Sequence, residues 1–173
     1  MPWDGTTLWA ASLGRGAGGV PEVRGAPVAV AGGPDESVVQ PTWGGDGALW
    51  WSSDRSGWWN LHRSFHPLSG DGADVEVVAP VEAEVGGPRW VGGLRWFAVL
   101  GDGRVLGSAS ADGTTGLVLA DAAVGGAPVP VPLEVGGSPV TYVSQVVAGP
   151  GPTQAVVVAA SATAEPTPVL LDL

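Results

Sequence analysis

The hydrophobic pattern along the chain predicts β-strands rather than helices. The apolar runs are short and rich in valine, and Gly, Pro, Asp or Ser bounds them. Such runs are typical of antiparallel strands joined by tight turns. Helices have little room, because all but one of the stretches free of Gly and Pro are nine residues or shorter. The exception, residues 153–165, is rich in Val, Ala and Thr, which favours a strand there too.

The turns between these runs recur at a nearly constant spacing. A leucine follows a polar turn at Leu8, Leu61, Leu117 and Leu170, so the spacings are 53, 56 and 53 residues. A second class of turn, Gly-x-Gly, recurs at a similar spacing, at residues 45–47, 101–103 and 149–151. Four short strands and their turns fill a period of about 50 residues in the blades of β-propellers. The pattern therefore predicts an all-β propeller.

The same spacing divides the chain into a single partial propeller domain of about 3.5 four-stranded antiparallel blades, open rather than a closed ring. We expect a half blade at 1–35, full blades at 36–80 and 81–135, and an incomplete blade at 136–173. The expected strands are Thr6–Leu13 and Pro27–Ala31; Val38–Trp43, Ala48–Ser53, Trp58–Phe65 and Val75–Ala79; Arg89–Leu100, Arg104–Ala109, Leu117–Ala122 and Val129–Leu133; and Val140–Ala148, Gln154–Ser161 and Pro168–Leu173.

Composition narrows the classes of function. The 29 Gly and 16 Pro could suggest disorder, but nine Trp require a core in which to be buried. The net charge is −10, and the seven basic residues, all Arg, are scattered. That balance argues against nucleic-acid and anionic-membrane partners. Cysteine is absent, and no apolar run approaches a membrane span or a signal peptide. We expect a cytoplasmic protein with no metal and no cofactor.

Residues 40–63, QPTWGGDGALWWSSDRSGWWNLHR, resemble the blade motif of TolB-like propellers. The closer resemblance is to the propeller of prolyl oligopeptidase-family serine peptidases of the acylaminoacyl- and dipeptidyl-peptidase-like group. Residues 1–9, 31–41 and 82–93 support it, and the match weakens beyond about Leu106. Two departures, Gly44-Gly45 in place of Ser-Pro and His62 in place of Tyr, affect the local turn and strand packing.

The resemblance implies a longer parent with about seven blades followed by an α/β-hydrolase domain that carries Ser, Asp and His. No Ser in this chain has Gly at both −2 and +2, so the nucleophile elbow of such a domain is absent from these residues. We therefore expect this chain alone to be inactive. His62 is interpreted as a strand side chain, because there is no elbow Ser for it to activate.

The residues of the blade motif are expected to be structural. Asp in the turn at 53–57 can accept backbone hydrogen bonds, and Gly there can adopt a positive φ. The two tryptophans that follow are expected to point to opposite faces of the third strand and pack against both neighbouring blades. The motif residues are Trp43, Asp46, Gly47, Asp54, Arg55, Gly57, Trp58, Trp59 and Asn60.

Three other patterns suggest ligands. Residues 14–19 contain G-x-G-x-x-G, but Pro21 and Pro27 argue against the helix of a dinucleotide site, so a hairpin loop is expected. Residues 71–76 contain three carboxylates, whose spacing does not match a calcium loop. Glu82 and Glu84 are candidate substrate-binding residues, because propeller carboxylates in some relatives hold a peptide's free amino terminus. Exposed loop charges are the alternative.

Two hypotheses of function follow. In the first, the chain is the substrate-gating propeller fragment of a serine peptidase that hydrolyses short peptides or acylaminoacyl peptides, and its partners are the missing blades and the hydrolase domain. In the second, it is a non-catalytic TolB-like propeller that acts as a protein-interaction or ligand-binding module. The coding sequence on either side would separate them.

Overall fold

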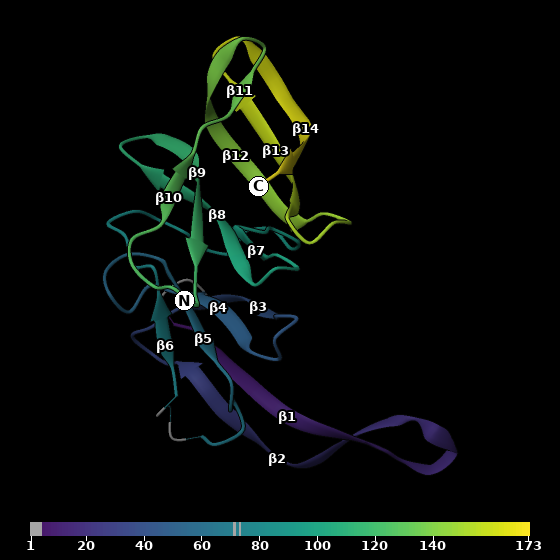
Figure 1. The fold of residues 1–173 in the computed structure, drawn as a ribbon. Coiled ribbons are helices and arrows are strands. Elements are labelled where there is room, and N and C mark those ends of the chain that lie inside the picture. Colours follow the sequence, from purple (N-terminus) through teal and green to yellow (C-terminus); the bar gives the residue numbers. More distant parts are fainter. Residues whose placement is uncertain (1–4, 71, 73) are drawn as a thin grey trace.

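The computed structural model describes residues 5–70, 72 and 74–173, and these residues form an all-β, open partial propeller. One two-stranded sheet and three four-stranded antiparallel sheets follow one another along the chain (Figure 1). The two-stranded sheet contains β1 (Thr7–Arg15) and β2 (Pro21–Gly32). The others contain β3 (Val38–Trp43), β4 (Leu49–Ser53), β5 (Asn60–Ser64) and β6 (Glu76–Val78); β7 (Phe97–Val99), β8 (Arg104–Ala111), β9 (Thr114–Asp121) and β10 (Val129–Val131); and β11 (Glu134–Val135), β12 (Ser138–Ala148), β13 (Gln154–Ser161) and β14 (Ala164–Asp172).

The core consists of three apolar clusters, one between each pair of consecutive sheets. Leu49 and Trp51 of β4 pack in the cluster shared with β1 and β2, whereas Trp50 packs in the cluster shared with the sheet of β7 to β10. Successive side chains of a strand point to opposite faces, so β4 supplies both clusters at once. The third cluster, which includes Leu106 and Val146, joins the last two sheets. Each sheet is therefore held mainly by its neighbours along the chain.

Several strand limits differ from the expected ones. The strand expected to start at Trp58 starts at Asn60, because Trp58 and Trp59 still belong to the turn. The strand expected at Arg89–Leu100 contains only Phe97–Val99, since Pro88, Gly92 and Gly93 keep the preceding residues in a loop. A short strand, β11, was not expected at all.

The last turn of the repeat is a further correction. A polar turn was expected directly before the strand at Pro168–Leu173, but the residues there, 165–167, lie inside β14. The turn is at residues 162–163, where Ser161 Oγ accepts a hydrogen bond from Thr163 N at 3.2 Å. Pro166 and Pro168 fit in β14 because it is an edge strand, where a missing N–H leaves no ladder bond unmade.

Strands β1 and β2 form a long antiparallel arm that extends away from the other sheets (Figure 1). The residues of the G-x-G-x-x-G pattern lie at its tip, where a single 3-10 turn (Ala17–Gly19) joins the strands. The expected hairpin loop is therefore confirmed. Gly18 has a φ of 72°, a value that side chains disfavour. No helix in the described part of the chain is long and apolar enough to cross a membrane.

Candidate functional site

The turn between β4 and β5 ties its own sheet to the segments on either side. Asp54 Oδ1 accepts a hydrogen bond from Ser37 N at 2.7 Å. Arg55 donates two hydrogen bonds to the Glu36 carboxylate, at 2.9 and 3.0 Å, and Ser53 Oγ donates a third at 2.6 Å. Gly57, with a φ of 85°, closes the turn in a conformation that only glycine adopts readily. The turn therefore fixes where β3 begins.

Glu36 stays ionised to a lower pH than an ordinary glutamate. Burial by itself would raise its pKa, but the hydrogen bonds from Arg55 and Ser53 and the positive charge of Arg55 outweigh burial and lower the pKa. Since these bonds favour the charged carboxylate, they stabilise the turn at neutral pH.

Asn60 and the two tryptophans connect the same turn to the segment that leads to the next sheet. Asn60 Oδ1 accepts a hydrogen bond from Val81 N at 2.8 Å, and Asn60 Nδ2 donates one to Val81 O at 3.2 Å. Trp59 is buried beside Gly86, whereas Trp58 keeps 38% of its surface exposed. The expectation that both rings pack between blades therefore fails for Trp58, whose ring stays partly exposed.

The remaining motif residues have local roles. Asp46 Oδ1 accepts a hydrogen bond from Ala48 N at 3.0 Å, and Gly47 has a φ of 85°, so these two residues shape the turn between β3 and β4. Trp43, at the end of β3, is 62% exposed and lines a groove.

Glu82 and Glu84 differ in their surroundings. The carboxylate of Glu84 accepts a hydrogen bond from Trp59 N at 2.8 Å, and the Glu84 backbone pairs with Ser110 of β8. Glu82 lies on the exposed surface of the same loop. Glu84 thus holds two sheets together, and a role for either carboxylate toward a peptide amino terminus stays a prediction.

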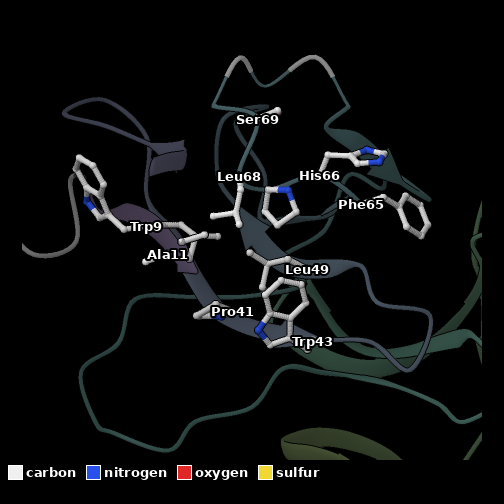
Figure 2. A pocket seen from close by; sticks show the side chains of 12 residues that line it. Trp9, Ala11, Pro41, Trp43, Leu49, Phe65, His66, Leu68 and Ser69 are labelled. Carbon is white, nitrogen blue, oxygen red and sulfur yellow. The ribbon is translucent and has the colours of Figure 1, made fainter. Parts of the chain in front are cut away.

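A groove runs between β1 and the sheet of β3 to β6. Its volume is about 830 Å³, and its walls are residues 8–11 of β1, Pro41, Trp43, Leu49 and residues 65–69. Figure 2 shows Trp9 and Ala11 on one side, with Trp43, Leu49 and Phe65 on the other. The lining is mainly apolar, and His66 is its one ionisable side chain. This surface is suited to apolar side chains rather than to charged chemistry.

Comparisons with known proteins identify relatives of the whole described fold. The chain is 32% identical to a puromycin hydrolase, with a TM-score of 0.79, and 34% identical to its S511A variant complexed with PGG, also at 0.79. A puromycin-hydrolyzing peptidase of Mycobacterium tuberculosis is 30% identical, with a TM-score of 0.77. Each alignment covers 99% of this chain. The chain matches the propeller portion of prolyl oligopeptidase-family peptidases.

This propeller portion spans 23% of the length of each of those structures. No family pattern and no curated protein matches the sequence. The structural relatives confirm the resemblance to the propeller of prolyl oligopeptidase-family peptidases.

Neither histidine of the propeller portion is placed for nucleophilic catalysis. His62 is buried in β5, stacks on Trp51 with ring centroids 6.0 Å apart, and has its Nδ1 3.0 Å from Asn60 O. Burial lowers the pKa of His62. His66 is exposed and lies 3.4 Å from the Asp74 carboxylate. The structure thus agrees with a structural role for His62.

The two described carboxylates of the possible calcium loop, Asp74 and Glu76, already have protein partners. Asp74 accepts hydrogen bonds from Ser64 Oγ and His66 N, and Glu76 pairs with Arg63 at 2.7 Å. Asp71, the third carboxylate, lies outside the described residues. Within the described ranges, no group of three or more His, Asp or Glu could hold a metal ion.

Gln40 is a residue that sequence reasoning missed. Its Nε2 donates to Phe97 O at 2.6 Å, and its Oε1 accepts from Trp96 N at 2.6 Å. The side-chain amide therefore pairs with the next sheet as another strand would. Gln40 has a φ of 53°, a conformation that strains side-chain-bearing residues. A glutamine between two valines and Pro41, in a run that is otherwise typical of a buried strand, was the available signal.

Proposed function

We propose that this chain is the substrate-gating propeller portion of a cytoplasmic serine peptidase that hydrolyses short peptides or acylaminoacyl peptides. The observation that supports this is the alignment of 99% of the chain, at 30–34% identity, with peptidases that hydrolyse puromycin. Puromycin-like compounds are accordingly the first substrates to test on the parent protein. The catalytic Ser, Asp and His would belong to a hydrolase domain outside these 173 residues.

The proposed partners are that hydrolase domain and the remaining blades of the propeller. The two-stranded sheet of β1 and β2 supports this, because it has half the strands of each of the other sheets. The chain aligns with 23% of the length of its structural relative, so the rest of that protein is long enough to contain both partners.

A domain exchange tests the proposal directly. The aligned portion of the puromycin hydrolase would be replaced by this chain, and puromycin hydrolysis by the chimera measured. We expect activity within about tenfold of the parent, since an intact propeller limits access without supplying reacting groups. A folded chimera that cannot hydrolyse puromycin contradicts the proposal.

The chain alone provides the second measurement. We expect no turnover of aminoacyl chromogenic substrates, because these residues contain no nucleophile elbow. Turnover that a serine-directed phosphonate inhibits would show this expectation to be wrong. The alternative of a non-catalytic TolB-like module would gain support from coding sequence that ends after a few more blades with no G-x-S-x-G.

A further inference from the structure

Residues 95–97 link three neighbouring sheets near the axis of the partial propeller. The side-chain amide of Gln40 in β3 pairs with the backbone of residues 96 and 97. On the other side, Arg95 forms a parallel bridge with Gln145 of β12. Strands β3 and β7 are edge strands of their sheets, and blades meet along such edges around the central channel of a propeller. A ligand that travels along this axis therefore passes close to Arg95.

Arg95 and Gln145 present polar groups that no protein group uses. Bridged residues of neighbouring strands point to the same face, so the two side chains lie next to each other. Arg95 is exposed and Gln145 is half-buried. Within the described residues, neither side chain has a hydrogen bond or an ion pair. Their backbone is held in place, because Val146 N donates to Arg95 O at 3.0 Å. The pair therefore offers several N–H donors from a fixed position.

An unpaired arginine is unexpected in so acidic a chain. The 17 Asp and Glu residues outnumber the seven arginines, and within the described residues four arginines pair with a carboxylate: Arg24, Arg55, Arg63 and Arg104. Residues 85–101 contain Arg89, Arg95 and no carboxylate, so this segment carries +2 and the other residues together carry −12. The segment is a local cationic site, which favours an anionic ligand.

We propose that Arg95 and Gln145 bind the free C-terminal carboxylate of short peptides. This rests on the proposed function, which brings short peptides to the axis of the propeller. The guanidinium and the side-chain amide donate hydrogen bonds to the carboxylate oxygens, and the charge-assisted bond from Arg95 is the stronger one. A C-terminal amide carries no negative charge, so the site selects peptides whose C-terminus is not blocked.

The intact chain tests the site without any hydrolysis. The chain is titrated with the tripeptide Ala-Ala-Ala and with its C-terminal amide, while the side-chain Nε–H signals of the seven arginines are followed by NMR. We expect the Arg95 signal to shift and saturate with the free tripeptide. The amide should bind at least about fivefold more weakly, because hydrogen bonds between charged groups are stronger than those to a neutral amide.

Two variants of the same segment separate the site from a general effect of charge. Arg95→Gln should abolish the preference for the free carboxylate. Arg89→Gln removes the same charge but should preserve the preference, because Arg89 lies beside residues 6–8 rather than beside β12. Gln145→Ala should weaken binding of Ala-Ala-Ala about two- to fivefold. Equal affinities for the tripeptide and its amide, or equal losses in both arginine variants, would overturn the proposal.

The chimera with the puromycin hydrolase distinguishes the peptide carboxylate from a carboxylate of the hydrolase domain. We expect Arg95→Gln to lower the ratio of kcat/KM for Ala-Ala-Ala to that for its amide at least about fivefold, mainly through KM. An unchanged ratio would overturn the proposal and assign Arg95 to a contact with the hydrolase domain. A folded chimera that cannot hydrolyse puromycin contradicts the proposed function alone, because the titration of the chain does not require hydrolysis.

Discussion

Strands β4 and β1 carry similar side chains in opposite surroundings. All five residues of β4 are buried, and Trp50 and Trp51 are 0% exposed. In β1 only Leu8 is buried, while Trp9 is 60% exposed. Strand β4 has a sheet on each face, whereas β1 belongs to a two-stranded arm. The comparison shows that Trp50 and Trp51 are buried because β4 has a sheet on each of its faces, whereas Trp9 lies on an arm that has none on one side.

Replacement of the two tryptophans by alanine should give the largest contrast. Trp51→Ala removes a fully buried ring and should lower the free energy of unfolding by about 3–5 kcal/mol. Trp9→Ala, on the arm, should lower it by clearly less, because the Trp9 ring is already 60% exposed. Urea unfolding of both variants measures the difference. Equal effects would remove the distinction between the two strands.

Gln40→Leu tests the connection between the second and third sheets. The substitution leaves Trp96 N and Phe97 O without their partner, and we expect a loss of about 2–4 kcal/mol, since each unpaired buried group costs about 1–3 kcal/mol. Gln40→Glu keeps the acceptor for Trp96 N and loses the donor to Phe97 O. In the same urea titration, the Gln40→Glu variant should therefore be no more stable than the native chain. A Leu variant as stable as the native chain would contradict this role of Gln40.

His62 makes the buried sheet sensitive to pH. Burial lowers its pKa in the folded chain, so the unfolded chain binds a proton more readily. The neutral ring therefore contributes its full stability above about pH 6.5, and stability falls as the pH drops from there toward the folded pKa. His62→Phe keeps a ring against Trp51 and should flatten this part of the profile. Thermal unfolding between pH 7.5 and 5 measures it, and an unchanged profile in the variant would show that other groups cause the loss.

The Glu36–Arg55 pair at the turn should give the smallest effect. Arg55 is 42% exposed, so Arg55→Ala should cost about 1 kcal/mol or less at pH 7. The pKa of Glu36 is lowered in the folded chain, so the contribution is present above about pH 4.5 and is lost as the pH falls through the folded value. Urea unfolding at a series of pH values from 7 downward should therefore show a difference that is constant above about pH 4.5 and shrinks as the pH falls below it. A difference that does not change with pH would assign the effect to packing of the Arg55 stem.

The fold was predictable from local signals, and the contacts between sheets were not. The valine-rich runs and the turns at 45–47 and 101–103 indicated the blades, because strand and turn preferences act over a few residues. The extent of the strand before Val99 was wrong, since apolar residues in a glycine-rich loop look like a strand. Gln40 was missed because its partners, Trp96 and Phe97, are more than 50 residues away in sequence.

The clusters between consecutive sheets also have a kinetic consequence. A chain in which each unit contacts only its neighbours behaves approximately as a one-dimensional array, so local opening starts at the ends. Backbone amides of β4 and β8, which lie inside complete sheets, should exchange with deuterium only through large-scale opening. Backbone amides of the arm should exchange early. Among the other sheets, exchange should be slower the farther a sheet lies from the ends of the chain.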